Sequence, residues 1–266
     1  MDKRPVGVFD SGLGGLTAVR AMTELFPHED IIYFGDNGRV PYGTRSRSTI
    51  LRYAGQGVAL LASLDVKSIV VACGTVSAVA LDELECDRPM TGVIHPSVER
   101  AAKLTKNGKV GLIATPASVR SGAYSRAMSA VSPDVELISR DCRLLVPLVE
   151  AGRFAPDDRV AQILVAEYLS PLREAGVDTL ILGCTHYPLL APLIADFMGS
   201  GVELVNSGEE AVRALDGMME PGDTSRLGSC SFYVSDDPEG FVSSASIFLQ
   251  SDVRGEVTLV DIDRMA

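Results

Sequence analysis

The sequence predicts an α/β protein of two pseudo-symmetric lobes, each with a mostly parallel sheet, and an active site in the cleft between them. Three observations support this prediction. Short apolar runs rich in β-branched residues alternate with stretches of helical periodicity along the chain. The alternation restarts near the middle of the chain with similar sequence. Polar or nucleophilic residues follow several apolar runs directly, as they do where parallel strands end at a binding site.

The first half of the chain supplies three strands with two helices between them. "PVGVFD" predicts a strand that ends at Asp10, and "DIIYFGD" predicts the next strand. The third strand, "KSIVVAC", ends at Cys73 and follows a helix expected from about Ser46 to Leu64. The apolar face of the earlier helix comprises Leu16, Val19, Met22 and Phe26.

The second half repeats this arrangement from about residue 95. "VGVFDSG" resembles "VGLIATP", and "DVKSIVVACGT" resembles "GVDTLILGCTH". The separation grows along the chain, as a few loop insertions would produce. The matched pairs are Asp10 with Thr115 and Asp36 with Asp141 (105 residues apart), Val40-Pro41 with Val146-Pro147 (106 apart) and Cys73 with Cys184 (111 apart).

The repeat divides the chain into two lobes. We expect residues 1–95 to form the first lobe and residues 96–207 to form the second. The remaining segment, 208–266, contains the strand-like runs "CSFYVS" and "EVTLVDID" and is expected to complete the first lobe. A cleft between the lobes would hold Cys73 on one wall and Cys184 on the other, because both residues end equivalent strands.

Composition and charge exclude several classes of protein. A net charge of −11 without a basic patch argues against a nucleic-acid surface. No apolar run reaches the roughly 18 residues of a membrane span, and the N-terminus lacks a signal-peptide pattern, so the cytoplasm is the expected compartment. The five cysteines are scattered without a CxxC pair, so neither a disulfide framework nor a structural metal site is expected.

Two glycine-containing loops are candidates for ligand contact, and neither indicates a nucleotide cofactor. The spacing in "DSGLGGL" is not GxGxxG, and Asp10 at its mouth would repel a pyrophosphate. Close packing of the following helix on the strand is the simpler explanation of Gly14 and Gly15. The loop "VPYGTR" offers the backbone of Tyr42 and Gly43 to a substrate carboxylate, or else forms an ordinary turn.

The paired cysteines favour one class of reaction. A lone cysteine after an apolar strand is more often a small buried hydrophobe than a catalyst. Cys73 and Cys184, however, stand at equivalent positions, and both precede polar residues. Inversion of a carbon stereocentre by proton transfer needs an acid-base group on each face, and a thiol with a pKa of about 8.5 can act as either. The sequence therefore predicts an enzyme that inverts a stereocentre with two thiols.

Three ionisable residues are candidates to assist the thiols. His186 can share the proton of the cysteine two residues before it, or it is a structural histidine. Asp10 can assist the other cysteine or hold a substrate ammonium; alternatively, Asp10 or Ser11 caps the following helix. Glu150 lies either in the cleft or on the solvated surface.

Several motifs together resemble the glutamate racemases, members of the cofactor-independent aspartate/glutamate racemase superfamily. They are "FDSGLGGL", "IIYFGD" followed by "RVPYG", "VACGT", "PLVEAG" and "GVDTLILGCTHYPLL". The matched segments extend from residue 6 to about residue 215. The resemblance implies reversible interconversion of L- and D-glutamate without pyridoxal phosphate or another cofactor. It also implies D-glutamate supply for bacterial peptidoglycan, a cytoplasmic location and a homodimer.

The resemblance further implies roles for individual residues. Cys73 and Cys184 would be the two acid-base groups, with help from Asp10 and His186. Glu150 would lie on the Cys184 side. The implied substrate contacts are Asp10, Ser11, Pro41, Tyr42, Gly43, Gly74, Thr75, Thr115, Thr185 and His186.

One position departs from the pattern of this family. Its usual first cysteine motif reads Ala-Cys-Asn-Thr, whereas Gly74 follows Cys73 here. Only the backbone N–H of Gly74 is left to bind substrate, and a lost hydrogen bond to a charged group costs roughly 1.5–3 kcal/mol. Two alternatives stay open: a racemase of aspartate or a related amino acid, and a racemase-like protein that binds glutamate without turnover. A cysteine hydrolase fits less well, because it needs only one nucleophile.

Overall fold

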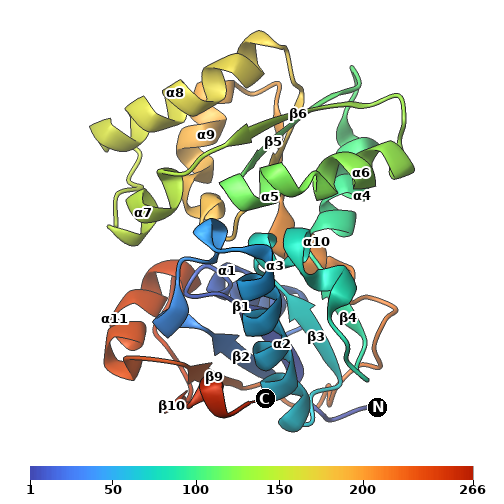
Figure 1. The fold of residues 1–266 in the computed structure, drawn as a ribbon, viewed down its shortest axis with the longest axis vertical. Helices are drawn as coiled ribbons and strands as arrows, with labels where there is room; N and C mark the ends of the chain where they lie inside the picture. Colours follow the sequence, from blue (N-terminus) through green and yellow to red (C-terminus); the bar gives the residue numbers. More distant parts are fainter. Residues whose placement is uncertain (266) are drawn as a thin grey trace.

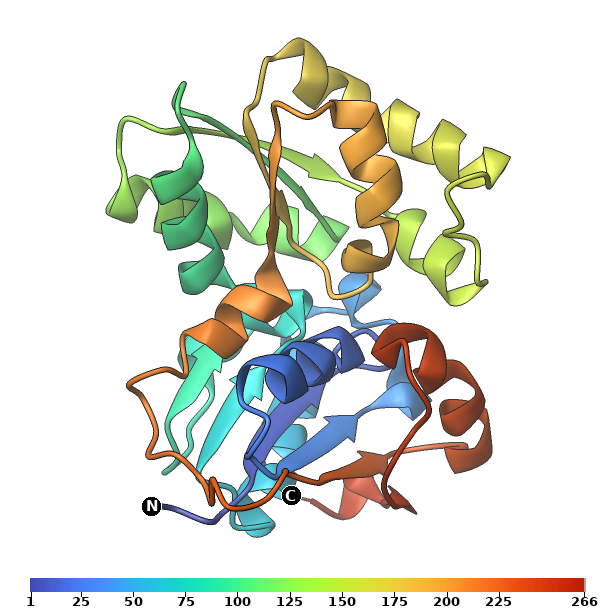
Figure 2. The ribbon, with the colours of Figure 1, turned by 180° about the vertical axis from the view of Figure 1, so that it is seen from behind.

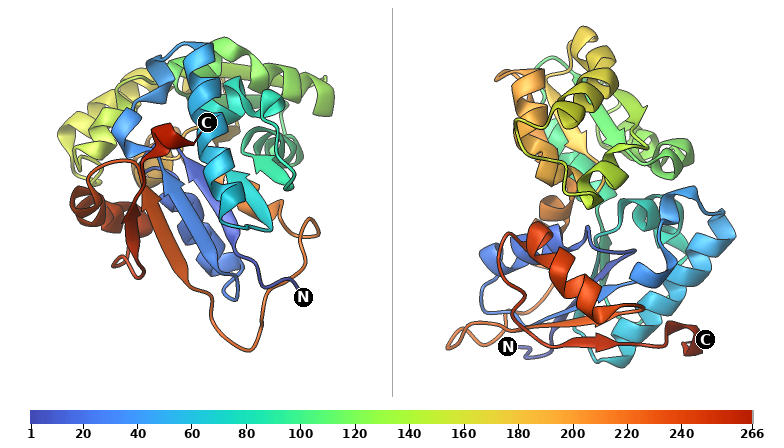
Figure 3. Two further views of the ribbon diagram at one scale, coloured as in Figure 1. Left: turned by 60° about the horizontal axis from the view of Figure 1, so that its bottom comes forward. Right: turned by 90° about the vertical axis from the view of Figure 1, so that its left-hand side faces the viewer.

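The computed structural model describes residues 1–265 as two lobes, one above the other in Figure 1. Each lobe is built around its own sheet, and every strand pair in both sheets is parallel. The right-hand view of Figure 3 shows the lobes as two bodies that meet near the middle of the molecule. The predicted α/β class with two parallel sheets is therefore confirmed.

The first lobe contains a six-stranded sheet in the order β10-β9-β2-β1-β3-β4. β9 and β10 come from the last part of the chain and extend the sheet beside β2, as Figure 2 shows from behind. The strands are β1 (Val6–Asp10), β2 (Ile31–Gly35), β3 (Ser68–Val71), β4 (Met90–Gly92), β9 (Cys230–Val234) and β10 (Val257–Leu259).

Helices cover both faces of this sheet. Val8 and Tyr33 belong to the core shared with α1 and α11, whereas their neighbours Phe9 and Phe34 pack in a second core with α2. This division follows from the strand, in which successive side chains point to opposite faces. The helices are α1 (Leu16–Leu25), α2 (Arg47–Ser63), α3 (Gly74–Val79) and α11 (Pro238–Leu249), with the 3-10 helices η1 (Asn37–Arg39), η2 (Tyr42–Thr44), η3 (Leu81–Glu83) and η5 (Ile262–Arg264).

The helix expected from about Ser46 to Leu64 is confirmed as α2. Ser46 is its N-cap, and the Ser46 hydroxyl accepts a hydrogen bond from the backbone N–H of Thr49 at 3.3 Å. Such a cap satisfies one of the N–H groups that a helix leaves without a partner in its first turn.

The second lobe contains a four-stranded sheet in the order β6-β5-β7-β8. Its strands are β5 (Lys109–Ala114), β6 (Glu136–Asp141), β7 (Thr179–Leu182) and β8 (Glu203–Asn206). Its helices are α5 (Pro116–Ser121), α6 (Ala123–Val131), α7 (Leu145–Glu150), α8 (Arg159–Glu174) and α9 (Ala191–Met198), with the 3-10 helix η4 (Tyr187–Leu190).

The two sheets share one strand order. In chain order, β1 to β4 are arranged as β2-β1-β3-β4, and β5 to β8 are arranged as β6-β5-β7-β8. Cys73 follows β3, and Cys184 follows β7, which occupies the matching place in the other sheet. The sequence repeat therefore corresponds to a structural repeat.

Two helices carry the chain between the lobes. α4 (Ile94–Leu104) leads from β4 to the second sheet and packs on α6. α10 (Ser207–Arg213) leads back from β8 and packs on α1. α4 and α10 also contact each other, so both crossings lie side by side. None of the helices in residues 1–265 is both long and apolar enough to cross a membrane.

Candidate active site

A cavity of about 280 Å³ lies between the lobes and is lined by residues that follow strand ends in both sheets. Each wall carries one of the two predicted thiols. Every residue predicted from the sequence to act in catalysis or to contact substrate lines this cavity, except Asp10. The residues that do so are Ser11, Pro41, Tyr42, Gly43, Cys73, Gly74, Thr75, Thr115, Glu150, Cys184, Thr185 and His186.

Cys73 connects β3 to α3 and is the N-cap residue of that helix. Only 4% of Cys73 is exposed, and its Sγ lies 3.3 Å from the Ser11 Oγ, to which it donates. Burial, reinforced by the neighbouring charge of Asp10, raises the pKa of the Cys73 thiol to about 12. Cys73 therefore holds its proton at neutral pH and can act as an acid.

Cys184 faces an imidazole instead. Its Sγ lies 3.8 Å from Nδ1 of His186, and Nε2 of the same ring lies 3.1 Å from Oε1 of Glu150. Burial opposes a charge on His186, but the hydrogen bonds to Cys184 and Glu150 outweigh it and raise the pKa of His186 to about 10. His186 can therefore exchange a proton with Cys184, while Glu150 orients the ring.

Asp10 lies behind the cavity wall. It is only 1% exposed, its Oδ2 accepts the N–H of Gly12 at 2.9 Å, and its Oδ1 accepts the Thr185 hydroxyl at 3.5 Å. Burial raises the pKa of Asp10, although the His186 charge and these hydrogen bonds oppose the shift. Ser11 and Thr185, rather than Asp10, reach the cavity. A direct contact between Asp10 and substrate stays a prediction.

The loop between β1 and α1 packs on both lobes. The N-cap of α1 is Gly15, and no side chain caps the helix, so the capping alternative for Asp10 and Ser11 is wrong. A Cβ on Gly15 would lie 2.4 Å from Cβ of Asp10, in accord with close packing on the strand. A Cβ on Gly14 would lie 2.2 Å from Oγ1 of Thr185, so Gly14 packs on the opposite lobe instead.

Hydroxyl groups join the lobes beside the cavity. Oγ1 of Thr75 and Oγ1 of Thr115 lie 3.1 Å apart across the cleft. The hydroxyl of Thr17 in α1 donates to the carbonyl oxygen of Thr185 at 3.1 Å. All four residues are partly or fully buried, so these bonds help to hold the two walls together.

Gly74 also lies against the opposite lobe. A Cβ on Gly74 would lie 2.5 Å from the carbonyl oxygen of Gly183, which is closer than Cβ atoms approach in proteins. Backbone of the second lobe thus fills the space where the asparagine side chain usual in the family would begin. Gly74 lets the strand ends that carry Cys73 and Cys184 approach more closely than another residue would.

Eight further residues that were not predicted from the sequence also line the cavity. The repeat matches Val40-Pro41 with Val146-Pro147, and both pairs line the cavity, one from each lobe. The repeat therefore carried a signal for the second pair, whereas no pattern distinguishes Cys142 or Arg143. The additional lining residues are Gly12, Val40, Thr44, Pro116, Cys142, Arg143, Val146 and Pro147.

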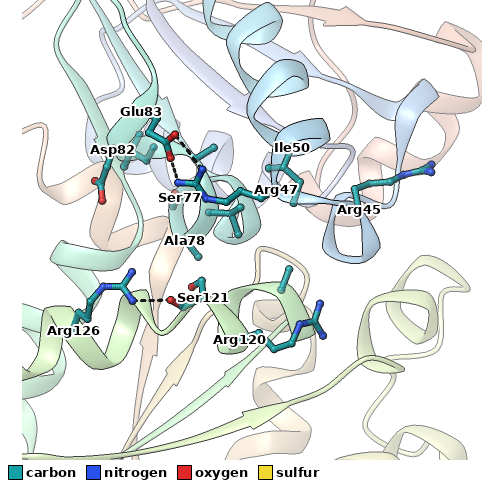
Figure 4. A pocket seen from close by; sticks show the side chains of 14 residues that line it. Arg45, Arg47, Ile50, Ser77, Ala78, Asp82, Glu83, Arg120, Ser121 and Arg126 are labelled. Atoms are coloured by element: carbon teal, nitrogen blue, oxygen red, sulfur yellow. Dashed lines mark hydrogen bonds and ion pairs between the residues drawn. The ribbon is translucent and has the colours of Figure 1, made fainter.

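A second cleft between the lobes has a different lining (Figure 4). The C-terminal ends of α3 and α5 border it, whereas the N-terminal ends of these helices border the thiol cavity. Three of its four arginines are directed to different places: Arg47 pairs with Glu83, Arg126 donates to the Ser121 carbonyl oxygen at 2.7 Å, and Arg45 points away. No group of three or more His, Cys, Asp or Glu in residues 1–265 is arranged to hold a metal ion.

Two buried thiols at equivalent strand ends, one from each lobe, line one small cavity in an α/β protein, an arrangement suited to an enzyme that inverts a stereocentre with two acid-base groups. A family model described as Asp/Glu/hydantoin racemase matches residues 16–215. The chain belongs to this family and is an amino-acid racemase.

Relatives of known name match over nearly the full chain. The glutamate racemase of Geobacter metallireducens is 44% identical over 99% of this chain and 98% of its own length. The glutamate racemase of Streptococcus agalactiae is 41% identical over 96% of this chain and 98% of its own length. The crystal structure of Francisella tularensis glutamate racemase with D-glutamate superposes with a TM-score of 0.90 at 37% identity, covering 99% of this chain and 100% of that one.

Proposed function

We propose that this racemase interconverts L- and D-glutamate by proton transfer at the α carbon between Cys73 and Cys184. The observation that carries the proposal is the placement of the two thiols on opposite walls of one cavity of about 280 Å³. A cavity of this size suits a single amino acid. The substrate preference is supported by relatives named glutamate racemase that are 41–44% identical over at least 93% of the chain.

The two sulfurs would divide the reaction between the faces of the substrate. One thiolate removes the α proton, and the electron pair stays on the α carbon, delocalised into the carboxylate. The other thiol delivers its proton to the opposite face, so the configuration inverts and the sulfurs exchange protonation states. No group other than the two sulfurs needs to gain or lose the proton during this step.

We infer the starting states of the two sulfurs from their surroundings. Cys73 begins as the acid, because its pKa is raised to about 12. Cys184 begins as the base, because His186 lies within reach to take its proton and Glu150 stabilises the resulting imidazolium. In the reverse direction the roles exchange, and Asp10 is the group that we propose to assist Cys73.

Binding would use the hydroxyls and the backbone around the cavity. Ser11, Thr75, Thr115 and Thr185 place hydroxyl groups along both walls. The hydroxyl of Tyr42 donates to a buried carboxylate outside the cavity. Tyr42 would therefore contact a substrate carboxylate through its backbone, together with Pro41 and Gly43 beside it. The backbone N–H of Gly74 would replace the side chain that this position usually supplies.

The biological setting extends the same proposal. Conversion of L- to D-glutamate would supply D-glutamate for peptidoglycan synthesis in the cytoplasm, by a homodimer. The resemblance to the glutamate racemases supports this setting. Light scattering on the purified protein tests the homodimer.

We also propose the boundaries of the two lobes. The first comprises residues 1–95 with residues 208–266, and the second comprises residues 96–207. The crossing of the chain between the lobes through α4 and α10 supports this division.

The reaction is tested by incubating the purified protein with L-glutamate in D₂O. The D-glutamate formed should carry deuterium at the α carbon, because the proton delivered to the new face comes from a thiol that exchanges with solvent. D-glutamate should likewise yield deuterated L-glutamate. Product without deuterium would rule out the two-thiol step, and a faster reaction with L-aspartate than with L-glutamate would overturn the substrate assignment.

A further inference from the structure

A buried ion pair lies behind the loop that carries Tyr42 and Gly43 into the cavity. Asp36 follows β2 and is fully buried. Nε of Arg39 donates to its two carboxylate oxygens at 2.7 and 3.0 Å, and the Tyr42 hydroxyl donates to one of them. One carboxylate thus binds two residues of the same loop.

Asp36 is also joined to the strand that ends at the site. Its backbone N–H donates to the carbonyl oxygen of Asp10 at 3.1 Å. Asp36 therefore links the end of β1, where Asp10 and Ser11 lie, with the loop whose residues Val40–Thr44 line the cavity. A shift of either segment would strain this bond.

Arg39 is held from several sides. Its side chain is 12% exposed, and its guanidinium lies 4.0 Å from the ring centroid of Tyr53. Nη1 donates to Oε1 of Gln56 at 2.6 Å and to Oδ1 of Asp263 at 3.2 Å. The Tyr42 and Tyr53 rings lie 5.6 Å apart, so the arginine and the loop rest on one aromatic surface of α2.

We propose that Asp36 and Arg39 are positioning residues of the racemase. They hold residues 37–44 so that the backbone of Tyr42 and Gly43 meets the substrate carboxylate. This inference rests on the proposed function. Neither residue lines the cavity, so both act through the loop rather than on the substrate.

The chemistry of the pair explains why it is suited to this role. A buried charge that loses its partner is strongly unfavourable, so Asp36 and Arg39 stay paired whenever the lobe is folded. A guanidinium presents several donors in one plane and can bind the carboxylate, Gln56 and an aromatic ring together. A lysine ammonium cannot reproduce this arrangement. The loop is therefore held before substrate arrives, which lowers the cost of binding.

The test measures KM and kcat for L-glutamate in the full-length wild-type enzyme and in its Arg39→Gln and Arg39→Lys variants. Arg39→Gln should raise KM about tenfold with a much smaller change in kcat, because the loop contributes binding that ground state and transition state share. Arg39→Lys should raise KM less. Asp263→Asn is the matched control: it removes only the charge of the exposed partner of Arg39 and keeps an Oδ1 that can accept the same hydrogen bond, so KM should be unchanged.

The possible results separate this inference from the proposed function. If wild-type protein does not racemise glutamate, the proposed function fails before any variant is compared. If wild-type protein is active and both Arg39 variants keep the wild-type KM, the positioning role is overturned. Activity that falls only with the folded fraction, measured by circular dichroism, would also overturn it. If Arg39→Gln does not fold, the test rests on the folded Arg39→Lys variant: a raised KM supports the positioning role, and a wild-type KM overturns it.

Discussion

Oε1 of Glu150 lies 3.1 Å from Nε2 of His186, at the side of the ring opposite Cys184. Each ring nitrogen therefore faces one partner, and the imidazole cannot turn without losing both contacts. The same two partners keep the ring protonated against the effect of burial. Glu150 is therefore placed to influence the thiol through the histidine between them.

Glu150→Gln should lower kcat and move the alkaline limit of activity to lower pH. The amide keeps a hydrogen-bond acceptor but loses the negative charge that helps raise the pKa of His186 to about 10. We expect a loss of about tenfold, modest because Glu150 is partly exposed to solvent. The measurement is kcat for L-glutamate between neutral pH and the alkaline limit.

A matched control is Glu174→Gln, which changes an exposed glutamate at the end of α8. This variant should keep the wild-type profile. If Glu150→Gln also keeps it, Glu150 does not act through His186.

Cys73→Ala and Cys184→Ala should each lower racemisation in both directions by at least about a thousandfold, the scale of a lost general acid or base. Each inversion uses both sulfurs, so neither variant should keep one direction. Circular dichroism at fixed substrate concentration measures the rate from each enantiomer. Cys86→Ala is the control, because Cys86 is partly buried in a loop and does not line the cavity. Residual racemisation near the wild-type rate in either active-site variant would contradict the two-thiol mechanism.

Most of the features that determine the positions of the two thiols could be predicted from the sequence. Alternating periodicity predicted the strands and helices, and the repeat predicted that Cys73 and Cys184 end equivalent strands. These features are local or internal to the chain, so one sequence suffices to find them. Helix α2 agrees with its expected range within one residue at each end, because Ser46 is a strong cap.

The contacts between the two lobes could not be predicted from the sequence. The hydroxyl pair of Thr75 and Thr115 depends on the separation of the two sheets, which the packing of α4 and α10 sets. The position of Asp10 behind the wall depends on the N–H of Gly12 and on Thr185 of the other lobe. Neither arrangement has a pattern in the order of residues.

The contacts of Asp30, which precedes β2, with Arg226 and Ser229 should weaken at acid pH. Asp30 accepts the N–H of Ser229 at 2.8 Å and pairs with Arg226. The Arg226 hydrogen bond, followed by those from Ser229, lowers the pKa of Asp30 well below its usual 3.8 in spite of partial burial. A lowered pKa in the folded state stabilises the fold above the unfolded pKa and loses this contribution as pH falls through the folded value.

Asp30→Asn should therefore lower the free energy of unfolding by about 1–2 kcal/mol at pH 7. The difference from wild type should shrink as pH drops below 3.8. Urea unfolding at a series of pH values measures it. Asp196→Asn changes an exposed aspartate of α9 and should have little effect. A difference between Asp30→Asn and wild type that does not depend on pH would show that charge is not the cause.

Gly74→Ala should lower kcat/KM for glutamate at least about tenfold, because a displacement of around 1 Å at reacting groups is enough to cost that much. The added Cβ would lie 2.5 Å from the carbonyl oxygen of Gly183, and a backbone atom can yield only if the lobes separate. Gly74→Asn, which restores the usual residue of the family, should lower kcat/KM for the same reason.

Gly55→Ala is the control for Gly74→Ala. The added Cβ at Gly55 in α2 would meet nothing within 4 Å, so kcat/KM should stay at the wild-type value. The free energy of unfolding should rise by up to about 1 kcal/mol, because alanine is the better helix former. Wild-type kcat/KM in Gly74→Ala would show that the contact with Gly183 does not set the separation of the thiols.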